Sequence, residues 1–148
     1  MVVNAEVCAD AEAFQVRLKG TFYGILQWKD LDALWERIKG GQWFFYQLGE
    51  ETPTSPLIGD ELTMRIDALN TLLRSEHDFH LCGIVYVDHV ESPTLIKVYD
   101  PNNLGSACSR STAPTPPRWI LSTVQPPLIE NHDPAPNNRK RWWQLFSR

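Results

Sequence analysis

The sequence predicts an α+β fold, in which a mostly antiparallel sheet of about five to six strands carries two amphipathic helices. Strand-like runs come in adjacent pairs rather than in regular alternation with helices, and two segments have clear helical periodicity. A chain of 148 residues with 43% hydrophobic content is long enough for one core-bearing domain and too short for two ordinary ones.

The first half of the chain supplies three strands and one helix. Residues 14–18 and 21–27 are strand-like, and the Lys-Gly pair between them suggests a hairpin. The first helix covers 30–38, because Asp30 is a good N-cap, apolar residues recur at spacings of three and four, and a Gly-Gly pair follows. Residues 42–48 are dense in aromatic side chains, which suits a central strand buried on both faces.

The second half supplies the other helix and three further strands. The helix begins near Asp60, after three proline and glycine breakers, and its buried stripe consists of Leu62, Ile66, Leu69, Leu72 and Leu73. Residues 79–90 and 94–100 are expected to form a second hairpin, and 118–124 a last short strand. Stripes of this kind are more typical of core packing than of cofactor binding.

The chain divides into a single α+β domain over 1–124 and a tail over 125–148. The tail begins with a proline-rich stretch typical of an extended linker and continues with a basic and aromatic segment. Residues 1–124 hold ten Lys and Arg against sixteen Asp and Glu, a net charge of −6. Residues 125–148 hold four basic and two acidic residues, a net charge of +2. The domain and its tail therefore have opposite charge.

The tail is the first candidate binding site. Its candidate partner-binding residues are Arg139, Lys140, Arg141, Trp142, Trp143 and Phe146. Trp and Arg are the residue types that most often dominate the energy of protein interfaces, so a protein partner is expected. The alternative is that the tail folds back on its own acidic domain. Contact with a membrane surface is not favoured because one short segment anchors weakly, and nucleic acid is not expected because the net charge of −4 repels phosphates.

An alternative ligand site combines a strand face with a long loop. Side-chain alternation along the predicted strand places four polar residues on one face, namely His80, Cys82, Tyr86 and Asp88. The loop 101–117 is longer than ordinary connections and contains Cys108 close to Arg110, whose charge favours a thiolate. His77, His80 and Cys82 have a spacing that resembles metal ligands, but a fourth ligand is missing, so we expect no metal site.

We therefore expect a small non-enzymatic accessory or adaptor protein that binds a protein partner through the tail and a polar sheet face, without a cofactor. The alternative is a small thiol-dependent enzyme or ligand-binding domain that uses the alternative ligand site. The N-terminal residues lack the basic and apolar segments of a secretory signal, and the three cysteines are far apart. The predicted location is the cytoplasm, and no segment is apolar for long enough to span a bilayer.

Overall fold

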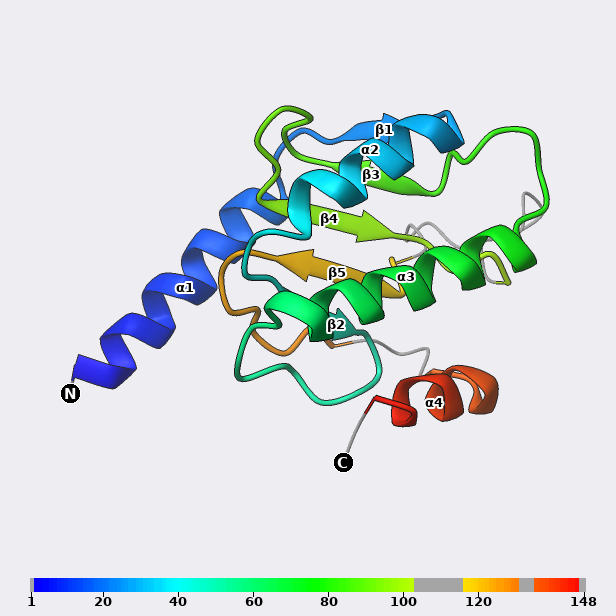
Figure 1. Cartoon of the computed structure of the whole chain (residues 1–148). Coiled ribbons are helices and arrows are strands. Elements are labelled where there is room, and N and C mark those ends of the chain that lie inside the picture. Colours follow the sequence, from blue (N-terminus) through cyan, green and yellow to red (C-terminus); the bar gives the residue numbers. More distant parts are fainter. Residues whose placement is uncertain (1, 103–115, 131–134, 147–148) are drawn as a thin grey trace, which may run out of the picture.

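The predicted α+β fold is confirmed by the computed structural model, which describes residues 2–102, 116–130 and 135–146. Five strands form one sheet in the order β1-β3-β4-β5-β2, and every neighbouring pair is antiparallel (Figure 1). The strands are β1 (Tyr23–Ile25), β2 (Phe44–Gln47), β3 (Val85–Val87), β4 (Leu95–Val98) and β5 (Trp119–Ser122).

Four helices accompany the sheet in the described part of the chain, where the sequence predicted two. They are α1 (Val2–Leu18), α2 (Trp28–Ile38), α3 (Gly59–Glu76) and α4 (Asn137–Gln144). Figure 1 shows α2 and α3 over one face of the sheet and α4 beside α3, at the β2 end of the molecule. None of the described helices is long and apolar enough to cross a membrane.

The larger hydrophobic core lies between the sheet and the helices α2 and α3. Every second residue of the central strands enters it, as Val85, Val87, Ile96 and Val98 do. Both predicted helical stripes are confirmed as buried, with Leu31, Leu34, Trp35 and Ile38 on α2 and Leu62, Ile66, Leu69, Leu72 and Leu73 on α3. We call this cluster the α2/α3 core.

A smaller core on the opposite face of the sheet contains Phe14, Tyr46, Leu48, Leu95 and Ile120. Phe14 belongs to α1, so the predicted strand over 14–18 is wrong. Segment 2–18 is free of Gly and Pro and rich in good helix formers, which favours a helix. The apolar residues at alternate positions 14, 16 and 18 imitate a strand, yet Phe14 is fully buried and Val16 is 73% exposed.

Two further details differ from the prediction. The helix α2 begins at Trp28 with Gln27 as its N-cap, and Asp30 lies in its first turn, where a carboxylate interacts well with the helix dipole. Residues 79–84 are irregular rather than part of the hairpin strand, because Gly83 has a φ of 68° and interrupts the extended backbone.

The aromatic strand β2 is an edge strand and not the predicted central one. It is buried nevertheless because other segments cover its outer side. Trp43 and Leu57 exchange two backbone hydrogen bonds of 3.1 and 2.8 Å, and Ile129 N donates to Tyr46 Oη at 3.1 Å. Burial on both faces therefore arises here from loops and the C-terminal segment, and the composition of a strand does not reveal its position in the sheet.

The C-terminal segment lies on the domain rather than away from it. Gly49 has a φ of 96°, and a Cβ at this position would lie 2.7 Å from the backbone nitrogen of Ala135. Ala135 itself is 3% exposed. The segment that leads into α4 therefore crosses the turn after β2 in close contact, and only glycine fits there.

The orientation of α1 gives the first prediction. In a strand Phe14 and Val16 would share a face, whereas in a helix they lie on opposite sides. Phe14→Ala should lower the free energy of unfolding by about 3–5 kcal/mol because it opens a cavity in the smaller core. The control Val16→Ala should change it by less than about 0.5 kcal/mol. Urea denaturation measures both, and equal losses would contradict the helical assignment.

Candidate functional site

The inner side of α4 is held by a buried arginine. The side chain of Arg139 is 2% exposed and lies between two carboxylates. Its Nε and Nη2 donate to Asp100 at 2.8 and 2.7 Å, and its Nη1 and Nη2 donate to Glu76 at 3.0 and 2.6 Å. Burial alone lowers the pKa of Arg139, but these hydrogen bonds outweigh burial and raise it. The guanidinium therefore joins the start of α4 to the end of α3 and the end of β4.

Asp100 is the shared acceptor of this group. It is 3% exposed, and it also accepts a hydrogen bond of 2.9 Å from Asn102 N. The guanidinium of Arg118 lies 3.6 Å away and donates at 3.0 Å to the carbonyl of Leu48. Burial raises the pKa of Asp100, but the hydrogen bonds from Arg139 and Asn102, with the nearby positive charges, lower it overall. The carboxylate is therefore ionised at neutral pH.

Two uncharged side chains extend the group into the sheet. Gln47 Nε2 donates at 3.2 Å to the backbone carbonyl of Arg139, and Gln47 Oε1 accepts at 2.8 Å from the indole nitrogen of Trp119. We call these residues the Arg139 network: Gln47, Glu76, Asp100, Arg118, Trp119 and Arg139. It connects α3, three strand ends and α4, and of its members only Glu76 is exposed.

The aromatic residues of α4 continue the same side of the helix. Arg139, Trp142, Trp143 and Phe146 are spaced by three and four residues, so they form one row. Trp142 packs edge-on against Trp119 with ring centroids 5.7 Å apart, and Trp143 lies at the same distance from Phe45. Both tryptophans are half-buried against the α2/α3 core.

Arg65 of α3 packs over this aromatic row. Its guanidinium carbon lies 5.5 Å from the ring centroid of Phe45, 5.0 Å from that of Trp143 and 4.3 Å from that of Phe146. Burial lowers the pKa of Arg65 to about 10, with the charge of Glu61 opposing the change. The side chain thus stays charged at neutral pH, and the aromatic faces replace part of its hydration.

The structure divides the predicted partner-binding set into two sides of α4. Arg139, Trp142 and Trp143 face the domain, as the fold-back alternative describes. Lys140 is half-buried, Arg141 is exposed, and Leu145, which the sequence argument did not select, is 78% exposed. Partner binding by the set stays a prediction, and the geometry restricts it to the outward side chains.

The four strand residues of the alternative ligand site do not share a face, so that prediction is wrong. His80 is exposed, Cys82 is 1% exposed within the α2/α3 core, and Tyr86 lies on the opposite face of the sheet beside Tyr99. Burial raises the pKa of the Cys82 thiol. The irregular backbone around Gly83 breaks the alternation on which the prediction depended. Cys108 and Arg110 lie outside the described residues.

Asp88 has a structural role. Its Oδ1 accepts hydrogen bonds from the backbone nitrogens of His89 at 2.8 Å, Thr94 at 2.9 Å and Leu95 at 3.1 Å, and its Oδ2 accepts one from the Thr94 hydroxyl. Burial raises the pKa of Asp88, but these hydrogen bonds lower it overall. The carboxylate therefore closes the turn between β3 and β4 and has few lone pairs left for a ligand.

His77 likewise supports the fold. Its Nε2 lies 2.8 Å from the carbonyl oxygen of Cys82, and because a carbonyl only accepts, Nε2 carries the proton. The ring also packs on Phe79 and Trp28, with centroids 4.7 and 6.2 Å away. Across the described ranges, no three His, Cys, Asp or Glu residues are gathered closely enough to hold a metal ion.

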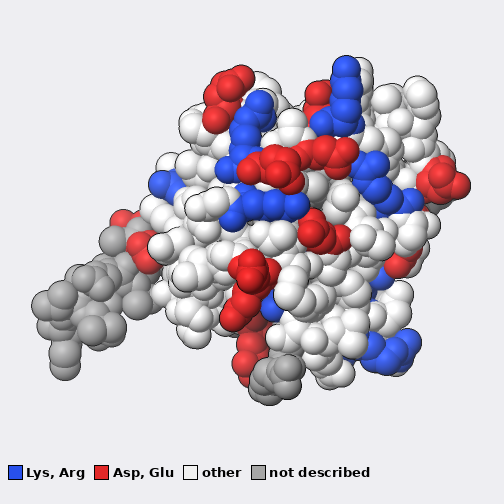
Figure 2. Space-filling model, viewed as in Figure 1, with Lys and Arg blue, Asp and Glu red and all other residues white. Residues whose placement is uncertain are grey.

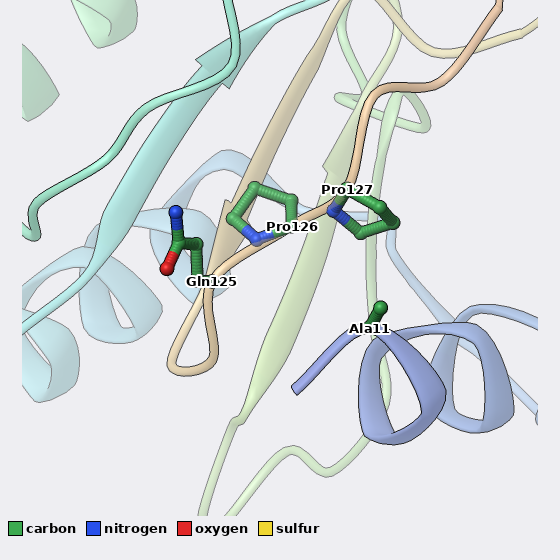
Figure 3. Close-up of a pocket in the computed structure, with 4 residues that line it drawn as sticks. All are labelled: Ala11, Gln125, Pro126 and Pro127. Atoms are coloured by element: carbon green, nitrogen blue, oxygen red, sulfur yellow. The ribbon is translucent and has the colours of Figure 1, made fainter. Parts of the chain in front are cut away.

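Lys97 of β4 pairs with Tyr86 of β3, so the two side chains lie on the same face of the sheet. Lys97 Nζ lies 3.9 Å from the ring centroid of Phe22, and burial lowers the pKa of this lysine. On this side of the molecule, Figure 3 shows a hollow between α1 and the segment after β5. It has a volume of about 50 Å³ and is lined by Ala11, Gln125, Pro126 and Pro127. It is far smaller than ordinary ligand pockets.

The Arg139 network generates the second prediction. Arg139→Leu should lower the free energy of unfolding by about 3–5 kcal/mol, because it leaves Asp100 buried without its main counter-charge. The matched control Arg141→Leu changes an exposed arginine of the same helix and should cost less than about 0.5 kcal/mol. Urea denaturation of both variants provides the measurement, and similar values would mean that α4 does not pack as described.

The lowered pKa of Asp100 gives a third prediction. Its stabilising effect is complete above the unfolded-state pKa of about 3.9 and is lost as the pH falls through the lower folded-state value. Stability of the wild-type chain should therefore fall as the pH drops below about 4, and Asp100→Asn should make this fall shallower. Denaturation curves at several pH values test this, with Asp78→Asn, at an exposed position outside the helices, as the control. Parallel pH profiles for wild type and Asp100→Asn would contradict it.

Comparison with known proteins identifies no relative of this chain. No protein-family model matches the chain, and no curated protein or solved structure matches it either. The function must therefore be argued from the arrangement of this chain's own side chains.

Proposed function

We propose that this protein is a non-enzymatic accessory or adaptor protein that binds a protein partner through the outer side of α4. This outer surface consists of Lys140, Arg141, Gln144 and Leu145, which alternate in sequence with the inward row. The same proposal places the protein in the cytoplasm, on the strength of its three widely spaced cysteines.

The single observation that carries the proposal is Leu145, a leucine that is 78% exposed and lies one helical turn after the exposed Arg141. Single exposed leucines are common, but this one sits at the end of a helix whose other side is fixed by the Arg139 network. A surface that is already ordered loses little conformational entropy when a partner binds. The outer side of α4 therefore combines apolar area, charge and rigidity.

The charge of this surface indicates the chemistry of the partner. Neither Lys140 nor Arg141 forms an ion pair with another described residue. Figure 2 shows basic side chains at the corner of the molecule where α4 lies, while basic and acidic side chains are mixed over the rest of this view. An acidic protein surface with an apolar socket for Leu145 would be complementary to it.

A polar sheet face around Tyr86 and Lys97 is the second contact region in the proposal. Tyr86 is half-buried, and its ring packs edge-on against Tyr99 with centroids 5.6 Å apart. Amphipathic rings of this kind are enriched at protein interfaces. The non-enzymatic part of the proposal is supported by the structural roles of His77, Cys82 and Asp88, whose polar groups are already engaged within the fold.

The fourth prediction tests the outer surface of α4. The full chain serves as bait for proteins from its source cells, and captured proteins are quantified for wild type and for Arg141→Glu/Leu145→Ser. Partner affinity should fall about 30-fold, as expected when an interface loses about 2 kcal/mol. The matched control Lys29→Glu/Met64→Ser makes the same two kinds of change at exposed positions of α2 and α3.

The comparison between the two double variants decides the result. A partner that is lost with the α4 variant and retained with the control would support the proposal. A captured set that both variants retain, or that both lose equally, would contradict it. Urea denaturation of each variant confirms that a loss of capture does not arise from unfolding.

A further inference from the structure

The two edges of the sheet differ in how they are covered. The edge at β2 is covered by the segment that pairs with Trp43 through Leu57, as described above. At the other edge, no described element lies beyond β1 (Figure 1). Proteins usually protect such edges, because their unpaired backbone groups can bind another strand. The outer edge of β1 therefore has backbone groups that are free to pair with another strand.

Exposed apolar side chains gather at this edge. Tyr23 is 54% exposed, Leu26 is 56% exposed and Val90, in the turn after β3, is 40% exposed. The strand contains Gly24 at its centre, where a Cβ would lie 3.2 Å from the ring of Tyr86. A larger side chain at this position would crowd the Tyr86 ring, and the glycine also leaves the outer backbone of the strand open to approach.

A cleft of about 280 Å³ runs beside this edge, between β1 and α2. Its lining includes Ile25 and Leu26 on the strand side and Asp30, Ala33 and Arg37 on the helix side. The three helix residues are separated by three and four positions, so they form one row along α2. In this row an acidic residue stands at one end, a small residue in the middle and a basic residue at the other end.

We propose that this edge binds a second copy of the same chain, with the two β1 strands paired antiparallel about a two-fold axis at Gly24. In this arrangement the two α2 rows run in opposite directions, so Asp30 lies opposite Arg37 of the second copy and the reverse pair forms as well. The small Ala33 lies near the axis, where the helices come closest. A row that is acidic at one end and basic at the other is complementary to itself under a two-fold axis.

The register of the paired β1 strands also supports a second copy of the chain as the partner at this edge. Pairing about Gly24 places Tyr23 opposite Ile25 of the second copy. Tyr23 and Ile25 both lie on the α2 side of the sheet, because their partners Val87 and Val85 belong to the α2/α3 core. The exposed Tyr23 ring therefore covers the cleft of the second copy, as an aromatic residue in a pocket typically does at an interface. The proposal is independent of α4 and its partner.

The fifth prediction concerns self-association, which analytical ultracentrifugation of the full chain and of charge-reversal variants measures. Wild type should associate reversibly to twice its mass of 17.0 kDa. Asp30→Arg and Arg37→Asp should each weaken association about 10-fold, since each reverses two symmetry-related pairs. The double variant Asp30→Arg/Arg37→Asp should restore it, because the two charges exchange places. Glu12→Arg, an exposed reversal on α1, is the control and should have no effect.

If the double variant restores dimerisation, the two residues form specific pairs across the interface, and a general effect of net charge does not explain the single variants. Hydrogen exchange at residues 21–26 gives a second readout, since these amides should be protected at high concentration and exchange faster on dilution. A wild-type chain that remains monomeric up to about 1 mM would overturn the proposal, and would leave the edge for a strand of another protein. A dimer whose affinity is unchanged by the Asp30 and Arg37 reversals would also overturn the proposal, as would a dimer in which the amides of residues 21–26 are not protected.

Discussion

The burial of Arg139 is the constraint on which much of the architecture depends. Removing a guanidinium from water costs several kcal/mol, and only well-placed carboxylates offset that cost. Asp100 and Glu76 supply them from the end of β4 and the end of α3. Gln47 holds the backbone carbonyl of Arg139 from β2. Because all these contacts are satisfied in one arrangement, the position and rotation of α4 are fixed, and so is the side of the helix that faces outward.

The aromatic groups beside this ionic group have a different character. Trp142 and Trp143 add apolar area to the α2/α3 core, while Arg65 replaces part of its hydration with ring faces. Ion pairing anchors the first turn of α4, and the aromatic contacts stabilise the turns that follow. A basic-aromatic sequence can thus serve the interior on one side and leave Lys140, Arg141 and Leu145 on the other.

Local patterns predicted the parts of the structure that depend on neighbouring residues. The stripes of α2 and α3, the pairing of β3 with β4, and the last strand could all be found from periodicity. The helix α1 could not, because Phe14, Val16 and Leu18 alternate as they would in a strand. The Arg139 network was missed because Asp100 and Glu76 are 39 and 63 positions away from Arg139 in the sequence, and no local pattern marks such a pairing.

The close crossing at Gly49 and the docking of α4 have a consequence for biosynthesis. A ribosome releases the chain from the N-terminus onward, so α1, the sheet and α3 emerge before residues 139–143 do. Until then Asp100 lacks the two hydrogen bonds from Arg139, and the rings of Phe45 and Trp119 lack their covering tryptophans. Before α4 packs, this end of the domain therefore exposes a carboxylate and aromatic rings to water, and the docking of residues 139–143 closes it.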